Sequence, residues 1–128
     1  MNQPDDPISA ATHDVPVDLS PVPLLEAIRS KKDKTWERLA PHYGVTNPDP
    51  PWKVTMEATF ECLSGCNALP SLQRRHAEDR LGETLYSETP APEQQLLSLA
   101  HTMLKRGLLS EEELAKRMSA IRTRLEMR

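Results

Sequence analysis

The segment 107–114, Gly-Leu-Leu-Ser-Glu-Glu-Glu-Leu, carries the clearest local folding signal in the chain. Gly107 is suited to end a preceding helix. The Ser110 hydroxyl can accept a hydrogen bond from the amide of Glu113, while the Glu113 carboxylate reaches back to the Ser110 amide. This capping box predicts a helix directly after Ser110. Apolar residues follow on one helical stripe, at Leu114, Met118, Ile121 and Leu125.

Helical patterns also dominate the chain on the N-terminal side of this turn. Apolar residues at Leu96, Leu97, Ala100, Met103 and Leu104 predict a helix that forms a hairpin with the C-terminal one. A further helix is expected from Trp52, with Trp52, Met56, Phe60 and Leu63 on its stripe. Another follows, with Ser71 as its N-cap and Gly82 as its C-terminal stop. No segment shows strand alternation, so an all-α fold of about five helices is predicted.

Prolines divide the N-terminal part of the chain. Residues 1–21 are rich in proline and polar residues, and they predict a disordered tail. Residues 22–44 predict a helical arm, a single amphipathic helix that frays near 30–33 and ends before Gly44. Three prolines make 45–51 a linker, and residues 52–128 form the main helical domain. The arm suits wrapping around a partner subunit, with a loosely docked local helix as the alternative.

The composition limits the classes of protein to consider. The 128 residues are 38% hydrophobic and 27% charged, which fits a globular chain. Only two Trp, two Tyr and one Phe are available for a core, so we expect another subunit to cover part of the apolar surface. A net charge of −3 argues against a nucleic-acid-binding protein. Neither a membrane span nor a secretory signal is evident, so a cytoplasmic location is expected.

The thiols and imidazoles do not form a recognisable catalytic or metal site. Cys62 and Cys66 are four residues apart on a predicted helix, a poor geometry for a disulfide and too few ligands for structural zinc. We interpret them as small buried hydrophobic residues in a reducing compartment. The histidines are scattered, at His13, His42, His76 and His101. No metal or cofactor is therefore expected on this chain.

Arginines concentrate in the predicted helix 71–82, at Arg74, Arg75 and Arg80. A guanidinium pairs two-pronged with oxyanions, so this density suggests anion binding. Surface ion pairs within the helix, with Glu78, Asp79 and Glu83, are the alternative. On a straight helix Arg75 and Arg80 point about 140° apart. Both reach one target only if the helix ends near Arg80, as Gly82 permits, or if their long side chains wrap.

The spacing of these motifs resembles a known family. Arg75, four residues, Arg80-Leu81-Gly82, three residues and Tyr86 are similar to the arginine motif of nitrile hydratase β subunits, which a turn like 107–114 also follows. Trp52, the segment 58–63, Arg74-Arg75 and the segment 82–86 resemble the small separate β chain of thiocyanate hydrolase. The resemblance covers residues 52–128.

The resemblance implies that the chemistry belongs to a partner. In this family an α-type subunit holds low-spin Co(III), less often Fe(III), in a cysteine claw with two cysteines oxidised to sulfenate and sulfinate. Cys62 and Cys66 do not reproduce that claw. The resemblance assigns Arg75 and Arg80 as donors to the oxidised sulfur oxygens, with Arg74 as a third candidate. Tyr86 is expected to line the substrate channel, with a core tyrosine as the alternative.

The chain ends at Arg128, where two-chain nitrile hydratases continue into an SH3-like barrel. We therefore expect a three-chain enzyme with a separate barrel subunit, in which this chain is the subunit without metal. The expected reaction is the hydration of a small nitrile to an amide by a cobalt enzyme. A thiocyanate hydrolase β subunit is one alternative. Others are the family's metal-loading activator, which often begins with a pair like Pro51-Trp52, and a plain helical scaffold.

Overall fold

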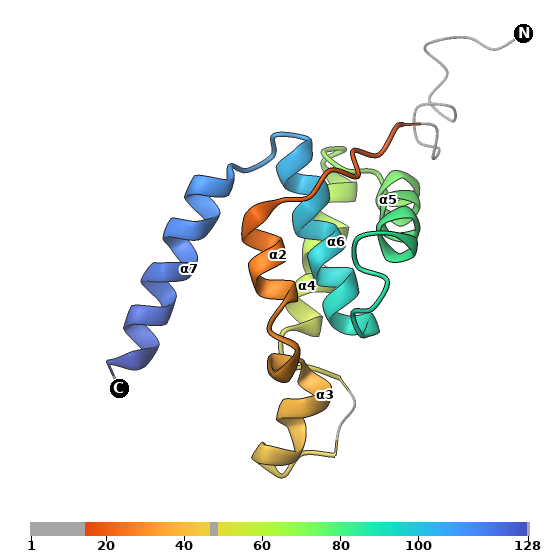
Figure 1. Ribbon diagram of the computed structural model, residues 1–128. Helices are drawn as coiled ribbons and strands as arrows, with labels where there is room; N and C mark the ends of the chain where they lie inside the picture. Colours follow the sequence, from red (N-terminus) through yellow and green to blue (C-terminus); the bar gives the residue numbers. More distant parts are fainter. Residues whose placement is uncertain (1–14, 47–48, 128) are drawn as a thin grey trace, which may run out of the picture.

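The computed structural model describes residues 15–46 and 49–127, and every regular element in these ranges is helical (Figure 1). The α-helices are α2 (Pro23–Arg29), α3 (Trp36–Leu39), α4 (Lys53–Gly65), α5 (Ser71–Glu83), α6 (Ala91–Lys105) and α7 (Glu111–Glu126). Two 3-10 turns, η1 (Lys32–Lys34) and η2 (Ala40–Tyr43), flank α3. The predicted all-α class is confirmed, with six α-helices in the described chain because the N-terminal helix is divided.

Helix α6 lies at the centre of the packing, against α5 and α2, while α4 also contacts α5 (Figure 1). It contributes to two groups of buried side chains. The first core cluster consists of Val22, Leu25, Leu81, Tyr86 and Leu97. The second core cluster consists of Met56, Leu69 and Leu99. Burial of this apolar surface is the main favourable term in folding, and α6 connects both clusters.

The predicted stripe on α4 is confirmed. Met56 is buried in the second core cluster, and Trp52, Phe60 and Leu63 pack against it. Trp52 occupies the N-cap position, so the helix begins at Lys53. After Gly65 the chain reverses through a left-handed residue, Asn67, with φ of 62°.

The expected boundaries of α5 need two corrections. Pro70 occupies the N-cap position, and Ser71 is the first helical residue. The Ser71 hydroxyl lies 3.0 Å from the Ser64 hydroxyl, so it does not cap the helix. At the other end the helix runs through Gly82 to Glu83. A Cβ at Gly82 would lie 2.8 Å from Oε1 of Gln94, so this glycine permits a close approach of α6 and is not a helix stop.

The predicted single helix over the arm is broken into separate elements, and the break begins where fraying was expected, near residues 30–33. Helix α2 ends at Arg29, and Thr35 is extended before α3 begins. The Trp36 amide donates to the Glu93 carboxylate at 2.6 Å, so a contact from α6 fixes the start of α3. Tertiary contacts thus override the helical periodicity here. The predicted end of the helical region before Gly44, which has φ of 67°, is confirmed.

Helix α2 belongs to the core and not to a separate arm. Leu25 is buried in the first core cluster together with Val22, the residue that precedes the helix. This differs both from an arm that leaves the body and from a loosely docked helix. The short helix α3 and η2 extend beyond the end of α2, at the lower end of the molecule in Figure 1.

The end of the expected disordered tail is also part of the fold. Residues 1–14 lie outside the described residues. Val17 and Leu19 pack against the first core cluster, so the prediction of a tail up to residue 21 is too long. Within the expected linker 45–51, residues 47 and 48 lie outside the described residues, and Pro50 is buried.

The C-terminal hairpin has the predicted turn, but its second helix diverges from the body (Figure 1). Gly107 is left-handed, with φ of 72°, and the Ser110 hydroxyl accepts from the Glu113 amide at 3.0 Å. The Glu111 carboxylate accepts from the Leu24 amide at 2.9 Å. No residue of α7 is buried. None of the described helices is long and apolar enough to cross a membrane.

Candidate functional site

Two of the three predicted arginines point into solvent from α5. Arg75 and Arg80 are exposed, and within the described chain neither forms an ion pair. Of the ion pairs that the sequence offered as the alternative, Arg74 with Glu78 is the one present in that part of the chain. Arg75 and Arg80 therefore keep their donors available for a group outside this chain.

Arg74 has a different environment, because it connects α5 to α4. Its guanidinium lies 3.9 Å from the centre of the Phe60 ring, and its Nη1 is 3.3 Å from Oε1 of Glu78. A guanidinium over an aromatic face is attracted by the ring quadrupole. Partial burial lowers the pKa of Arg74, while Glu78 opposes that shift. Arg74 is thus engaged within the chain.

The two exposed arginines lie on different sides of a continuous helix. Helix α5 ends at Glu83, one residue beyond the predicted stop at Gly82, and both arginines lie within the helix. Five residues separate Arg75 from Arg80 by about 7.5 Å along the axis and about 140° around it. One oxyanion reaches both only if the side chains wrap. Otherwise the two guanidinium groups reach different sides of α5.

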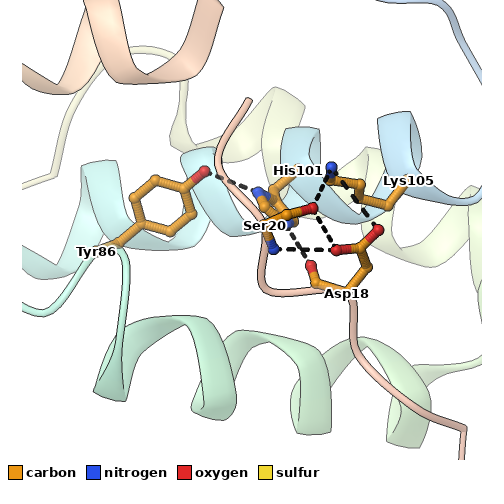
Figure 2. A network of polar contacts seen from close by, with 5 residues as sticks. All are labelled: Asp18, Ser20, Tyr86, His101 and Lys105. Carbon is orange, nitrogen blue, oxygen red and sulfur yellow. Dashed lines mark hydrogen bonds and ion pairs between the residues drawn. The ribbon is translucent and has the colours of Figure 1, made fainter. Parts of the chain in front are cut away.

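Tyr86 lies in the core, as in the alternative to a substrate-channel role. It is buried in the first core cluster, and its hydroxyl lies 3.0 Å from Nδ1 of His101 (Figure 2). The Nε2 atom of His101 lies 2.7 Å from the backbone oxygen of Asp18. A carbonyl oxygen only accepts, so Nε2 carries the proton and Nδ1 accepts from Tyr86.

The electrostatics of this pair favour the neutral forms. Burial is the main cause that lowers the pKa of His101, and the hydrogen bond to the Asp18 carbonyl opposes it. Burial likewise raises the pKa of Tyr86. A neutral imidazole with its proton on Nε2 satisfies both contacts, since Nε2 then donates to the Asp18 carbonyl and Nδ1 accepts from the Tyr86 hydroxyl.

The same network ties the N-terminal segment to α6 (Figure 2). The Lys105 ammonium donates to the Ser20 hydroxyl at 2.8 Å and lies 3.7 Å from the Asp18 carboxylate. Hydrogen bonds from Ser20 hold the pKa of Asp18 below its usual value. Residues 18 and 101 are 83 positions apart, so sequence spacing gave no signal for this contact. The network organises structure around α6.

The prediction that the two cysteines are buried is wrong. Cys62 and Cys66 are both exposed, and neither forms a disulfide. They lie off the apolar stripe that Met56 and Phe60 define on α4, so helical rotation turns them away from the core. Among the residues that the structure describes, no group of three or more His, Cys, Asp or Glu side chains could hold a metal ion.

The arginine site is open surface. A hollow of about 420 Å³ between α3, η2 and the first turn of α6 is lined by Trp36, Pro41 and Glu93, among others, but by neither Arg75 nor Arg80.

Comparisons of the chain with protein-family models, with curated proteins and with solved structures gave no match. The case for a function therefore depends on the residues and on their placement.

Proposed function

We propose that this chain is the helical subunit without metal of a cobalt-type nitrile hydratase, which hydrates a small nitrile to its amide. The observation that carries the proposal is the placement of Arg75 and Arg80 on α5, exposed and without an ion pair within the described chain. These are the residues to which the family resemblance gives a role at the metal site of the α-type subunit. A separate SH3-like barrel subunit would complete the enzyme.

Guanidinium groups suit the proposed target. Sulfenate and sulfinate oxygens carry negative charge that must be paired when a partner interface excludes water. Arg75 and Arg80 would donate hydrogen bonds to these oxygens and fix their orientation. The Co(III) ion, when bound on the α-type subunit, would supply Lewis-acid activation of the nitrile. Arg74, which already contacts Phe60 and Glu78, would position α5 against α4.

The position of the arginines also specifies the interface. Their directions differ by about 140° around the helix axis, so the α-type subunit would need a groove that receives α5 and contacts it on two sides. Tyr86 would take no part in the substrate channel, since its hydroxyl is bonded to His101 inside the core. Thiocyanate is the alternative substrate, and the partner chain that shares the substrate pocket would decide between nitrile and thiocyanate.

The test is co-expression with an α-type cysteine-claw chain and a barrel chain. We expect a stable complex that contains cobalt and forms amide from nitrile. Arg75→Lys and Arg80→Lys should each lower turnover on the order of 10²-fold with little loss of assembly, because lysine lacks the planar fork. Arg38→Lys, at an exposed arginine of α3, is the matched control. Unchanged turnover in both α5 variants would remove the role of these arginines.

A second candidate is the activator that loads metal into the α-type subunit. The exposed pair Cys62 and Cys66 favours it, because two thiolates one helical turn apart can hold a metal ion transiently. In this case the mature, cobalt-loaded enzyme would lack this chain. Cys62→Ser and Cys66→Ser would slow metal loading without changing the turnover of enzyme already loaded. Recovery of this chain in the active complex would exclude this candidate.

A further inference from the structure

Helix α7 is an amphipathic helix without a partner along most of its length. It contains 16 residues, so it is about 24 Å long, and none of its residues is buried. Its stripe begins with Leu114 and Met118, which are half-buried, and continues with Ile121 and Leu125, which are 45% and 53% exposed. An apolar stripe of this length on a helix that leaves the body marks an interaction surface.

The spacing of the stripe defines the shape of what it binds. Steps of four, three and four residues from Leu114 to Leu125 match the a and d positions of a heptad repeat. This pattern receives another helix by knobs-into-holes packing. The positions that flank such a seam are Ala115, Arg117, Arg122 and Arg124. They contain three cations and no carboxylate, so the surface is apolar with basic edges.

These edges argue against a second copy of the chain as the occupant. In a parallel pair, Arg117 of one copy would face Arg122 of the other. In an antiparallel pair centred on the stripe, Arg117 would face Arg124. Like charges that face each other between two packed helices are destabilising. The twofold symmetry of a dimer would place each such pair in the interface twice. Charge complementarity requires carboxylates at the flanking positions of the partner.

We propose that α7 docks onto an amphipathic helix of a partner protein whose apolar stripe is flanked by Glu and Asp residues. The inference is independent of the proposed function, since it involves neither arginine of α5. Helix α7 is already folded, and its first turn is held against the rest of the chain. The Ser110 cap and the bond between the Glu111 carboxylate and the Leu24 amide fix its first turn to the body. A preformed helix loses less conformational entropy on binding.

Two designed peptide helices test the proposal with the full chain. Both carry leucine at the a and d positions, and the acidic probe has glutamate at e and g where the basic probe has lysine. We measure fluorescence anisotropy of each labelled probe as the protein is added, at low and high salt. The acidic probe should bind at least about tenfold more tightly, and its affinity should fall with salt. Equal affinity for the two probes, or no binding, overturns the proposal.

Surface variants of α7 sharpen the test without touching the core. Arg117→Glu with Arg122→Glu should reverse the preference between the probes, whereas Lys116→Glu, on the opposite side of the helix, should preserve it. Ile121→Glu should abolish binding. Light scattering of the chain alone should show a monomer, and vesicles of phosphatidylglycerol should not bind it. A dimer lost in Ile121→Glu, or vesicle binding lost in Ile121→Glu, would assign the face to another occupant and overturn the proposal.

Discussion

Helices α6 and α7 have nearly the same length and similar apolar spacing, yet they have opposite environments. Helix α6 has 15 residues and buries Leu97, Ser98, Leu99, His101 and Thr102, whereas α7 has 16 residues and buries none. A hydrophobic stripe therefore predicts that a helix will form and which side will be covered. It does not predict whether the cover comes from the same chain.

The largest effect should come from the buried stripe of α6. Leu97→Ala removes a side chain from the first core cluster, and such truncations cost roughly 2–5 kcal/mol of unfolding free energy. Urea denaturation followed by circular dichroism measures the change. Ile121→Ala on α7 is the counterpart, expected to stay within about 0.5 kcal/mol. Similar losses at both positions would mean that α7 packs against the body.

A smaller effect is expected at the buried hydroxyl of Tyr86. Tyr86→Phe removes the donor to Nδ1 of His101 and leaves that acceptor unpaired, which costs about 1–3 kcal/mol. Denaturant unfolding measures the loss. Tyr43→Phe is the matched control, because Tyr43 is 70% exposed and should tolerate the change. Equal stability of Tyr86→Phe and the unchanged chain would show that the bond contributes nothing.

The pH dependence of stability tests the same part of α6. The folded-state pKa of His101 lies below the ordinary value of 6.5, so between these two values the unfolded chain binds a proton that the folded chain does not. Stability should be retained above pH 6.5 and should fall as the pH drops below it, at no more than about 1.4 kcal/mol per unit from this group. His101→Gln should flatten the slope, and an unchanged slope in this variant would mean that another group causes the pH dependence.

The cap of α7 should have a local effect. Ser110→Ala removes the acceptor for the Glu113 amide, at a cost of about 1 kcal/mol to the helix. Since α7 buries none of its residues, the loss should appear as faster amide hydrogen exchange in α7 with unchanged exchange in α6. Ser119→Ala, in the exposed middle of α7, is the control. Faster exchange in both helices would mean that they unfold together.

The smallest effect is expected at the far end of α7. Leu125→Ser should leave the unfolding free energy of the isolated chain within about 0.5 kcal/mol, because Leu125 is 53% exposed. The same variant should weaken binding of the acidic probe. A large loss of stability without any probe would place Leu125 in an intramolecular contact.

The sequence predicted the helices wherever local signals agreed. The apolar stripe of α4 and the Ser110 cap each depend on residues that are close together in the sequence. Both features are present in the structure. Fraying near residues 30–33 was predicted, and α2 ends there, but the start of a separate helix α3 depends on a bond from the Trp36 amide to Glu93, 57 residues away. The periodicity of the segment alone favoured one continuous helix.

The candidate site was only partly readable for the same reason. Sequence density singled out Arg74, Arg75 and Arg80, but it could not separate the arginine over Phe60 from the two in solvent. The cysteines were assigned to the core from their residue type, whereas their rotation on α4 decides their exposure. The His101 network joins segments far apart in the chain, and no local sequence motif predicts it.

Packing within this chain explains part of the segment Arg80-Leu81-Gly82, to which the resemblance gave a functional role. Because position 82 has no side chain, Gln94 reaches over it, and its Nε2 donates to the Tyr86 carbonyl at 2.9 Å. A bulkier residue at this position would displace that side-chain amide. Leu81 is therefore explained by its place in the first core cluster, and Gly82 is explained by its contact with Gln94. Arg80 is the residue of the three that lies exposed at the surface.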